Sequence, residues 1–112
     1  MSVSYFVRYE GRAPDAAAFL DYYRTHHVPL LARWPRIRQI VLHHPIAWHD
    51  PHPVHPDRFS LLVQMVFDSA ADLEAALHSA ERTAARQDSA HFPAFQGTVL
   101  HQAAEGEEVF RR

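Results

Sequence analysis

Four short stretches of the chain have the apolar content and the alternation that predict β-strands. Residues 3–9 are mostly β-branched or aromatic, which favours a central strand that ends at Gly11. Residues 37–44 alternate, residues 59–67 place five apolar side chains on one face, and residues 97–103 resemble a last strand. We therefore expect a sheet of four strands.

Two regions of the chain are predicted to be helical, the first from its 3.6-residue periodicity and the second from a capping pair at its start. The first begins at Pro14-Asp15 and runs at least to His27, with His27 inside the apolar stripe and His26 at its edge. Pro29 lacks an amide donor and disfavours helical angles in the residue before it, so we expect a kink or break near Val28. The second region begins after the capping pair of residues 69 and 72, runs to about residue 79, and resumes over residues 81–91.

The order of these elements predicts an α+β fold, namely a ferredoxin-like βαββαβ sandwich with an antiparallel four-stranded sheet. At 112 residues the chain fits a single domain, residues 1–112. The helices would cover one face of the sheet, and the other face, with Phe6, Leu62 and Val66, needs a cover of its own. We therefore expect a homodimer that forms through the open sheet face.

Composition excludes several classes of function. The formal net charge is −2 and no cluster of Lys and Arg is present, so we expect no nucleic-acid partner. The chain has no cysteine, and its three glycines form no phosphate-binding loop, so we expect no cofactor. No stretch approaches the roughly 20 apolar residues that span a bilayer, and no basic leader is present. We therefore expect no membrane partner and a cytoplasmic location.

His27 is the main candidate for chemistry. An imidazole on an apolar face needs a polar partner, and its pKa is sensitive to its surroundings. Tyr23 precedes it by one helical turn, and Asp88 could reach it from the second helical region and fix its tautomer. These residues would suit general acid or base catalysis. The other interpretation is a core histidine bonded to a carbonyl and a tyrosine, with Asp88 a solvated side chain or a cap.

The pattern Phe19-x-x-x-Tyr23-x-x-x-His27-x-Pro29-Leu30, followed by Pro35, resembles the signature of the EthD-like family of dimeric α+β barrel proteins. The second half is similar as well, with Phe67-Asp68-Ser69 leading into a helix and Asp88-x-x-x-Phe92 before the last strand. The resemblance covers nearly the whole chain. One departure is Arg36, where members of the family often have glycine after the proline, so the turn into the second strand could differ.

This resemblance implies a ferredoxin-like protomer, dimerisation through the open sheet face, and a pocket between the helices and the sheet. Related dimeric α+β barrels include cofactor-independent monooxygenases that act on polyketide anthrones and a methylmuconolactone isomerase, in which a pocket histidine serves as acid or base. Carried to this chain, that role falls on His27, with Tyr23 and Asp88 as supporting candidates.

The ligand would be an apolar small molecule, since pockets are mostly apolar with a few polar groups. The residues that we expect to contact it are Phe19, Leu30, Trp34, Phe92 and Phe95, although packing would explain them equally well. Residues 43–55 contain five histidines, but the prolines between them forbid a regular helix. We expect a loop over residues 45–56 and do not assign a specific metal site.

The leading hypothesis is a small-molecule enzyme without an organic cofactor, in which His27 is a general acid or base. Its substrate would be aromatic, lactone or polyketide-like, and the reaction that of an isomerase, a lyase or a cofactor-free oxygenase. One alternative is a non-catalytic binding or accessory protein for an apolar small ligand. Another is a haem or metal protein with a histidine ligand.

Overall fold

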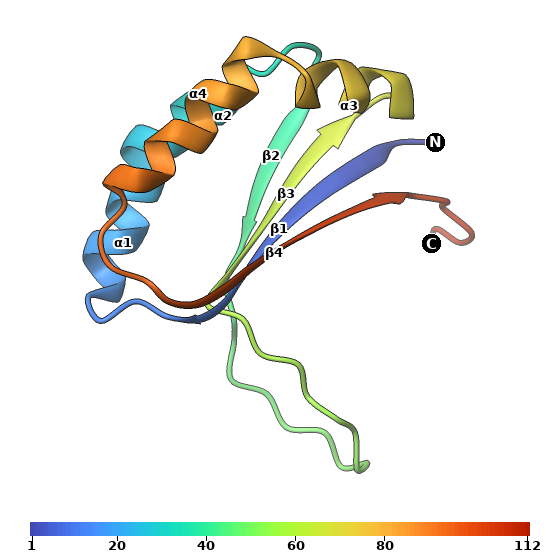
Figure 1. Cartoon of the computed structure of the whole chain (residues 1–112). Coiled ribbons are helices and arrows are strands. Elements are labelled where there is room, and N and C mark those ends of the chain that lie inside the picture. The colour runs from blue at the N-terminus through green and yellow to red at the C-terminus, as the bar shows by residue number, and fades with distance from the viewer.

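A four-stranded antiparallel sheet with helices on one face forms the framework of the molecule (Figure 1). The computed structural model describes residues 1–112. The strands are β1 (Val3–Arg12), β2 (Gln39–His43), β3 (Leu61–Phe67) and β4 (Gln96–Glu105), in the sheet order β2-β3-β1-β4. The predicted ferredoxin-like βαββαβ order and the antiparallel sheet are confirmed.

The two central strands alternate between a buried face and an open face. Tyr5 pairs with Met65 and Val7 with Val63, and these side chains are buried on the side of the helices. The residues between them point to the open face, as expected for a strand period of two. Phe6, Leu62 and Val66 lie there as predicted, and all three are only partly buried.

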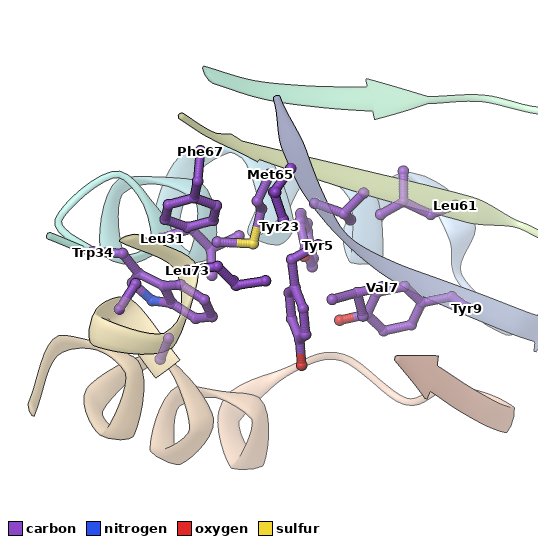
Figure 2. Close-up of a cluster of buried hydrophobic side chains, with 14 of the residues drawn as sticks. Tyr5, Val7, Tyr9, Tyr23, Leu31, Trp34, Leu61, Met65, Phe67 and Leu73 are labelled. Carbon is purple, nitrogen blue, oxygen red and sulfur yellow. The ribbon is translucent and has the colours of Figure 1, made fainter. Parts of the chain in front are cut away.

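The core lies between this sheet and the helices (Figure 2). Tyr5 of β1 projects toward the helices, where its ring centroid lies 6.1 Å from that of Trp34. Tyr9, farther along the same strand, packs edge-on against Phe19 and Tyr23. The best-buried side chains of β3, with no exposed surface, are Val63, Met65 and Phe67. Burying each of these side chains contributes on the order of 1.5–3 kcal/mol, so β3 supplies a large share of the energy that holds the sheet against the helices.

Gly11 does not end the first strand, so that prediction was wrong. β1 continues to Arg12, and Gly11 pairs with Gly97 of β4. Both glycines have positive φ, of 143° and 148°, and a Cβ on Gly11 would lie 2.2 Å from the carbonyl oxygen of Gln96. Only a residue without a side chain lets the two backbones approach this closely. The pair therefore extends the sheet instead of interrupting it.

The first helical region consists of α1 (Ala16–Tyr22), the π-helical turn η1 (Tyr23–His27) and α2 (Val28–Leu31). The side chain of Asp15 caps α1 by accepting a hydrogen bond from the amide of Ala18. We expected a kink or a break near Val28, and the helix does not break there. Val28 has helical angles (φ −55°, ψ −42°), and its amide donates to the carbonyl of Tyr23, five residues back. The wider π turn lets the helix continue into the segment that contains Pro29.

The turn between α2 and β2 contains a left-handed residue. Arg36 has a φ of +65°, a conformation that glycine adopts more easily than other residues. Its guanidinium lies 2.9 Å from the carboxylate of Asp72. The turn therefore uses the backbone conformation that glycine favours, with an arginine tied to the next helix.

The second helical region contains α3 (Ala70–Leu77), α4 (Ala80–Asp88) and the 3-10 turn η2 (Ser89–His91). Ser69 caps α3 by accepting from the amide of Asp72, as predicted, and Ser79 caps α4 in the same way. The helix α3 contacts β1 and β3, and α4 contacts α2. No helix is long and apolar enough to cross a bilayer.

Two parts of the chain lie outside this packing. All residues of the edge strand β4 are exposed, so the helical layer leaves β4 uncovered. Residues 44–60 form a long connection without regular structure that projects away from the sheet (Figure 1), as the loop prediction required. This arm, residues 44–60, exposes Ile46 (78%) and Trp48 (57%).

Candidate active site

A cavity of about 600 Å³ lies between the sheet and the second helical region. This volume is within the range of small-molecule pockets. Strands β1, β3 and β4 contribute its sheet wall. The rest comes from η1, α2 and the turn after it, α4, and the segment after α4. Its walls are rich in aromatic side chains, namely Tyr5, Tyr9, Tyr23, Trp34, Phe92 and Phe95. The wall of the cavity is therefore mainly apolar and aromatic.

His27 lines this cavity and is bonded to Asp88. Its Nδ1 lies 2.9 Å from the carboxylate oxygen Oδ2, and the side chains are 8% and 13% exposed. The hydroxyl of Tyr22 donates to the other carboxylate oxygen, Oδ1, at 2.7 Å. Asp88 thus joins a histidine of the cavity wall to a tyrosine on the same helical region.

The protonation states of this group follow from its contacts. Burial alone raises the pKa of Asp88, but hydrogen bonds from His27 and Tyr22 outweigh it, and the net pKa is lowered. Burial lowers the pKa of His27 more than Asp88 raises it. The carboxylate is therefore ionised and the imidazole neutral at pH 7. Since a carboxylate only accepts, Nδ1 carries the proton and Nε2 is the unprotonated nitrogen.

The local sequence explains how His27 is held. Tyr23 and His27 are at the two ends of the π turn η1, and their ring centroids are 4.9 Å apart. Phe92 packs edge-on against His27 at 4.7 Å. Asp88 ends α4, where the helix dipole disfavours a negative charge. Its contacts with His27 and Tyr22 offset that cost.

Two tyrosines of the cavity wall, Tyr9 and Tyr23, are held in their neutral form by burial. Burial raises the pKa of Tyr9 to about 12, although Tyr23 and Arg86 partly offset it. Burial also raises the pKa of Tyr23 well above its ordinary value, and Tyr23 is only 1% exposed. Both phenols therefore remain hydrogen-bond donors at neutral pH.

Most of the residues expected in the site line the cavity, and three do not. His27, Tyr23, Trp34, Phe92 and Phe95 line it. Phe19 is a buried core residue that packs on Tyr9. Leu30 does not line the cavity, whereas its neighbour Leu31 does. Asp88 does not line the cavity either, but it is hydrogen-bonded to His27, which does. His26 is exposed, as its position at the edge of the stripe predicted.

Sequence reasoning missed several polar residues of the site. Tyr22 lies outside the apolar stripe of the first helical region. The pattern of apolar residues in that region therefore did not indicate that the Tyr22 hydroxyl bonds to Asp88 of α4. His101 of β4 lies with its Nδ1 2.6 Å from the hydroxyl of Tyr5. Arg82 and Arg86 line the cavity from one face of α4, a relation that their spacing of four residues could have indicated.

The histidine-rich segment 43–55 lies apart from this cavity. His43 lies on β2, where its Nε2 is 2.9 Å from the side-chain oxygen of Gln64 on the open face of the sheet. The other four histidines of the segment, His44, His49, His52 and His55, lie in the arm. No group of three or more His, Asp or Glu side chains comes together in the structure.

Comparison with known proteins agrees with this fold. The EthD domain matches residues 13–96, which is most of the chain. An ethyl tert-butyl ether d (ethd) family protein from Bacillus halodurans c-125 has 23% identity and a TM-score of 0.75, over 96% of this chain and 100% of that one. A dimeric protein of ferredoxin-like fold from Bacteroides fragilis has 16% identity and a TM-score of 0.61, over 94% and 96%.

Two enzymes share the fold at lower identity. SnoaB, a cofactor-independent oxygenase from Streptomyces nogalater, has 14% identity and a TM-score of 0.63, over 99% of this chain and 98% of that one. The hydroxynitrile lyase from Passiflora edulis has 15% identity and a TM-score of 0.66, over 98% and 97%. No curated protein matches the chain in sequence.

Proposed function

The chain belongs to the EthD family, and on that premise we propose that it is a small-molecule enzyme that works without an organic cofactor. The observation that supports this most strongly is a buried histidine, hydrogen-bonded to a carboxylate, in the wall of an aromatic cavity. Two proteins of the same fold are an oxygenase described as cofactor-independent and a lyase, which is consistent with such chemistry.

His27 would act as the general base. Its Nε2 would accept a proton from a carbon next to a carbonyl, and Asp88 would stabilise the imidazolium that forms at Nδ1. The proton would return to the product or the leaving group in the second half of the reaction. Since burial holds the pKa of His27 below its ordinary value, the base is available at neutral pH.

The wall of the cavity favours an aromatic, lactone or polyketide-like substrate. Flat rings match the tyrosines and phenylalanines around the space, which supply stacking and edge contacts. Proton abstraction beside a carbonyl begins an isomerisation, an elimination or a cofactor-free oxygenation. The proposal therefore covers these three reaction classes.

The test replaces His27 with Gln and compares turnover and ligand binding on a panel of such substrates. We expect turnover to fall about 10²- to 10⁴-fold while binding is retained, because general acid–base catalysis contributes that much. His78→Gln is the matched control, because His78 is an exposed histidine at the C-terminal end of α3 that does not line the cavity. This variant should keep full turnover. Unchanged turnover in His27→Gln would contradict the role of His27. Binding without turnover by the unaltered protein across the panel would favour a binding protein instead.

We also propose that the open sheet face is the homodimer interface. Phe6, Leu62 and Val66 lie there only partly buried, and a similar protein of ferredoxin-like fold is dimeric. Native mass spectrometry of the purified protein should give the mass of a dimer, and Leu62→Glu should give a monomer because it would bury a charge against apolar side chains. A monomer for the unaltered protein at micromolar concentration would contradict this interface.

A further inference from the structure

The charges around the cavity are of one sign. Arg82 and Arg86 line it, and no aspartate or glutamate does. This contrasts with the chain as a whole, whose formal net charge is −2. The carboxylate closest to the chemistry, that of Asp88, is engaged by His27 and Tyr22. An excess of positive charge in an aromatic cavity is therefore a local property of this site.

Neither arginine has an acidic partner in the structure. The ion pairs of the chain involve other arginines or histidines. The side chain of Arg82 donates one long hydrogen bond, of 3.4 Å, to the carbonyl of Leu77. A guanidinium has five N–H donors and no acceptor, and it binds carboxylates with two parallel bonds. The acceptors for these donors would have to come from a ligand or from water.

The arginines face the opposite wall of the cavity closely enough to affect its titrating groups. Burial lowers the pKa of His101 on β4, and the charges of Arg86 and Arg82 lower it further. Arg86 also opposes the rise in the pKa of Tyr9 on β1. Tyr5 and Tyr9 project from β1 toward the helical layer (Figure 2), so a ring stacked among them would place its substituents near α4.

We propose that the cavity takes an anionic aromatic ligand, a carboxylate or an enolate or phenolate, whose negative oxygen is held by Arg82 and Arg86. This inference rests on the cavity of the proposed function and specifies the class of its substrate. His27 would remove a proton from the carbon next to a carbonyl. When the oxygen held by Arg82 and Arg86 is that carbonyl oxygen, the two arginines would also stabilise the enolate that forms. The ligand's apolar ring would lie among the aromatic side chains of the cavity.

Isothermal titration calorimetry with 2-naphthoate and its neutral isostere 2-naphthamide tests this proposal. We expect the unaltered protein to bind naphthoate at least about tenfold more tightly than naphthamide, a difference of about 1.4 kcal/mol, because hydrogen bonds between two charged groups are stronger than those to a neutral amide. Arg86→Gln and Arg82→Gln should each reduce that preference, and the double variant should abolish it. Arg24→Gln, which removes an exposed charge outside the cavity, should keep it.

Equal affinity for the two probes in the unaltered protein, or a preference that survives the double variant, would overturn the proposal. The outcome is independent of the role of His27. If His27 is not the base, His27→Gln keeps its turnover and the naphthoate preference remains. If the charge inference is wrong, the preference is absent while turnover still depends on His27.

Discussion

Removing the carboxylate of Asp88 should destabilise the fold by an amount that its contacts predict. In Asp88→Ala the buried Nδ1–H of His27 loses its acceptor, which costs about 1–3 kcal/mol. The hydroxyl of Tyr22 is more accessible and can bond to water instead, so its lost bond adds little to this cost. Relief of the unfavourable charge at the C-terminal end of α4 returns about 0.3–1 kcal/mol. The net loss is about 2 kcal/mol.

Urea denaturation at fixed protein concentration measures this loss, and a loss of that size corresponds to a fall of roughly 10 °C in melting temperature. Asp21→Ala is the matched control, since Asp21 is an exposed carboxylate of α1 whose side chain has no partner, and it should change stability by less than about 0.5 kcal/mol. Equal effects of the two substitutions would refute the reasoning, because they would show that the contacts of Asp88 contribute nothing to the folded state.

Two further results are expected. The free energy of unfolding should fall as the pH decreases below 6.5. Burial lowers the pKa of His27 in the folded state, so the unfolded chain binds the proton more readily. This part of the pH dependence should be missing from the His27→Gln variant. Gly97→Ala should cost more than about 2 kcal/mol in urea denaturation, because its Cβ would lie 2.1 Å from the carbonyl oxygen of Glu10 at a φ of 148°. Gly106→Ala, whose Cβ would meet nothing closer than 3.5 Å, should be nearly neutral, and comparable losses at the two glycines would contradict the close approach of β1 and β4.

The order of elements could be predicted because each has a strong local signal. The alternation of residues 59–67 matches β3, where every second side chain is buried, and Ser69 caps α3 as its spacing to Asp72 indicated. The failures occur where a contact distant in sequence overrides a local preference. Gly11 suggests a strand end until it is paired with Gly97, and Pro29 suggests a break until the π turn before it is seen.

The site shows the same division. The periodicity of the first helix correctly placed Tyr23 and His27 on the buried face. The sequence suggested that Asp88 could reach His27, and in the structure the two side chains lie within hydrogen-bond distance. The contact of Tyr22 with Asp88 joins residues 66 positions apart, and no pattern along the chain encodes the angle at which the two helical regions meet. Such contacts depend on tertiary packing and could not be found from the sequence.

The tautomer of His27 is the most direct test of the account, because it requires no substrate. Long-range ¹H–¹⁵N spectra of histidine-labelled protein at pH 7 distinguish the two ring nitrogens, and the signals missing from His27→Gln identify the residue. We predict a neutral ring with the proton on Nδ1, facing Asp88, and an unprotonated Nε2. A proton on Nε2, or an imidazolium at this pH, would contradict a general base that is oriented by Asp88.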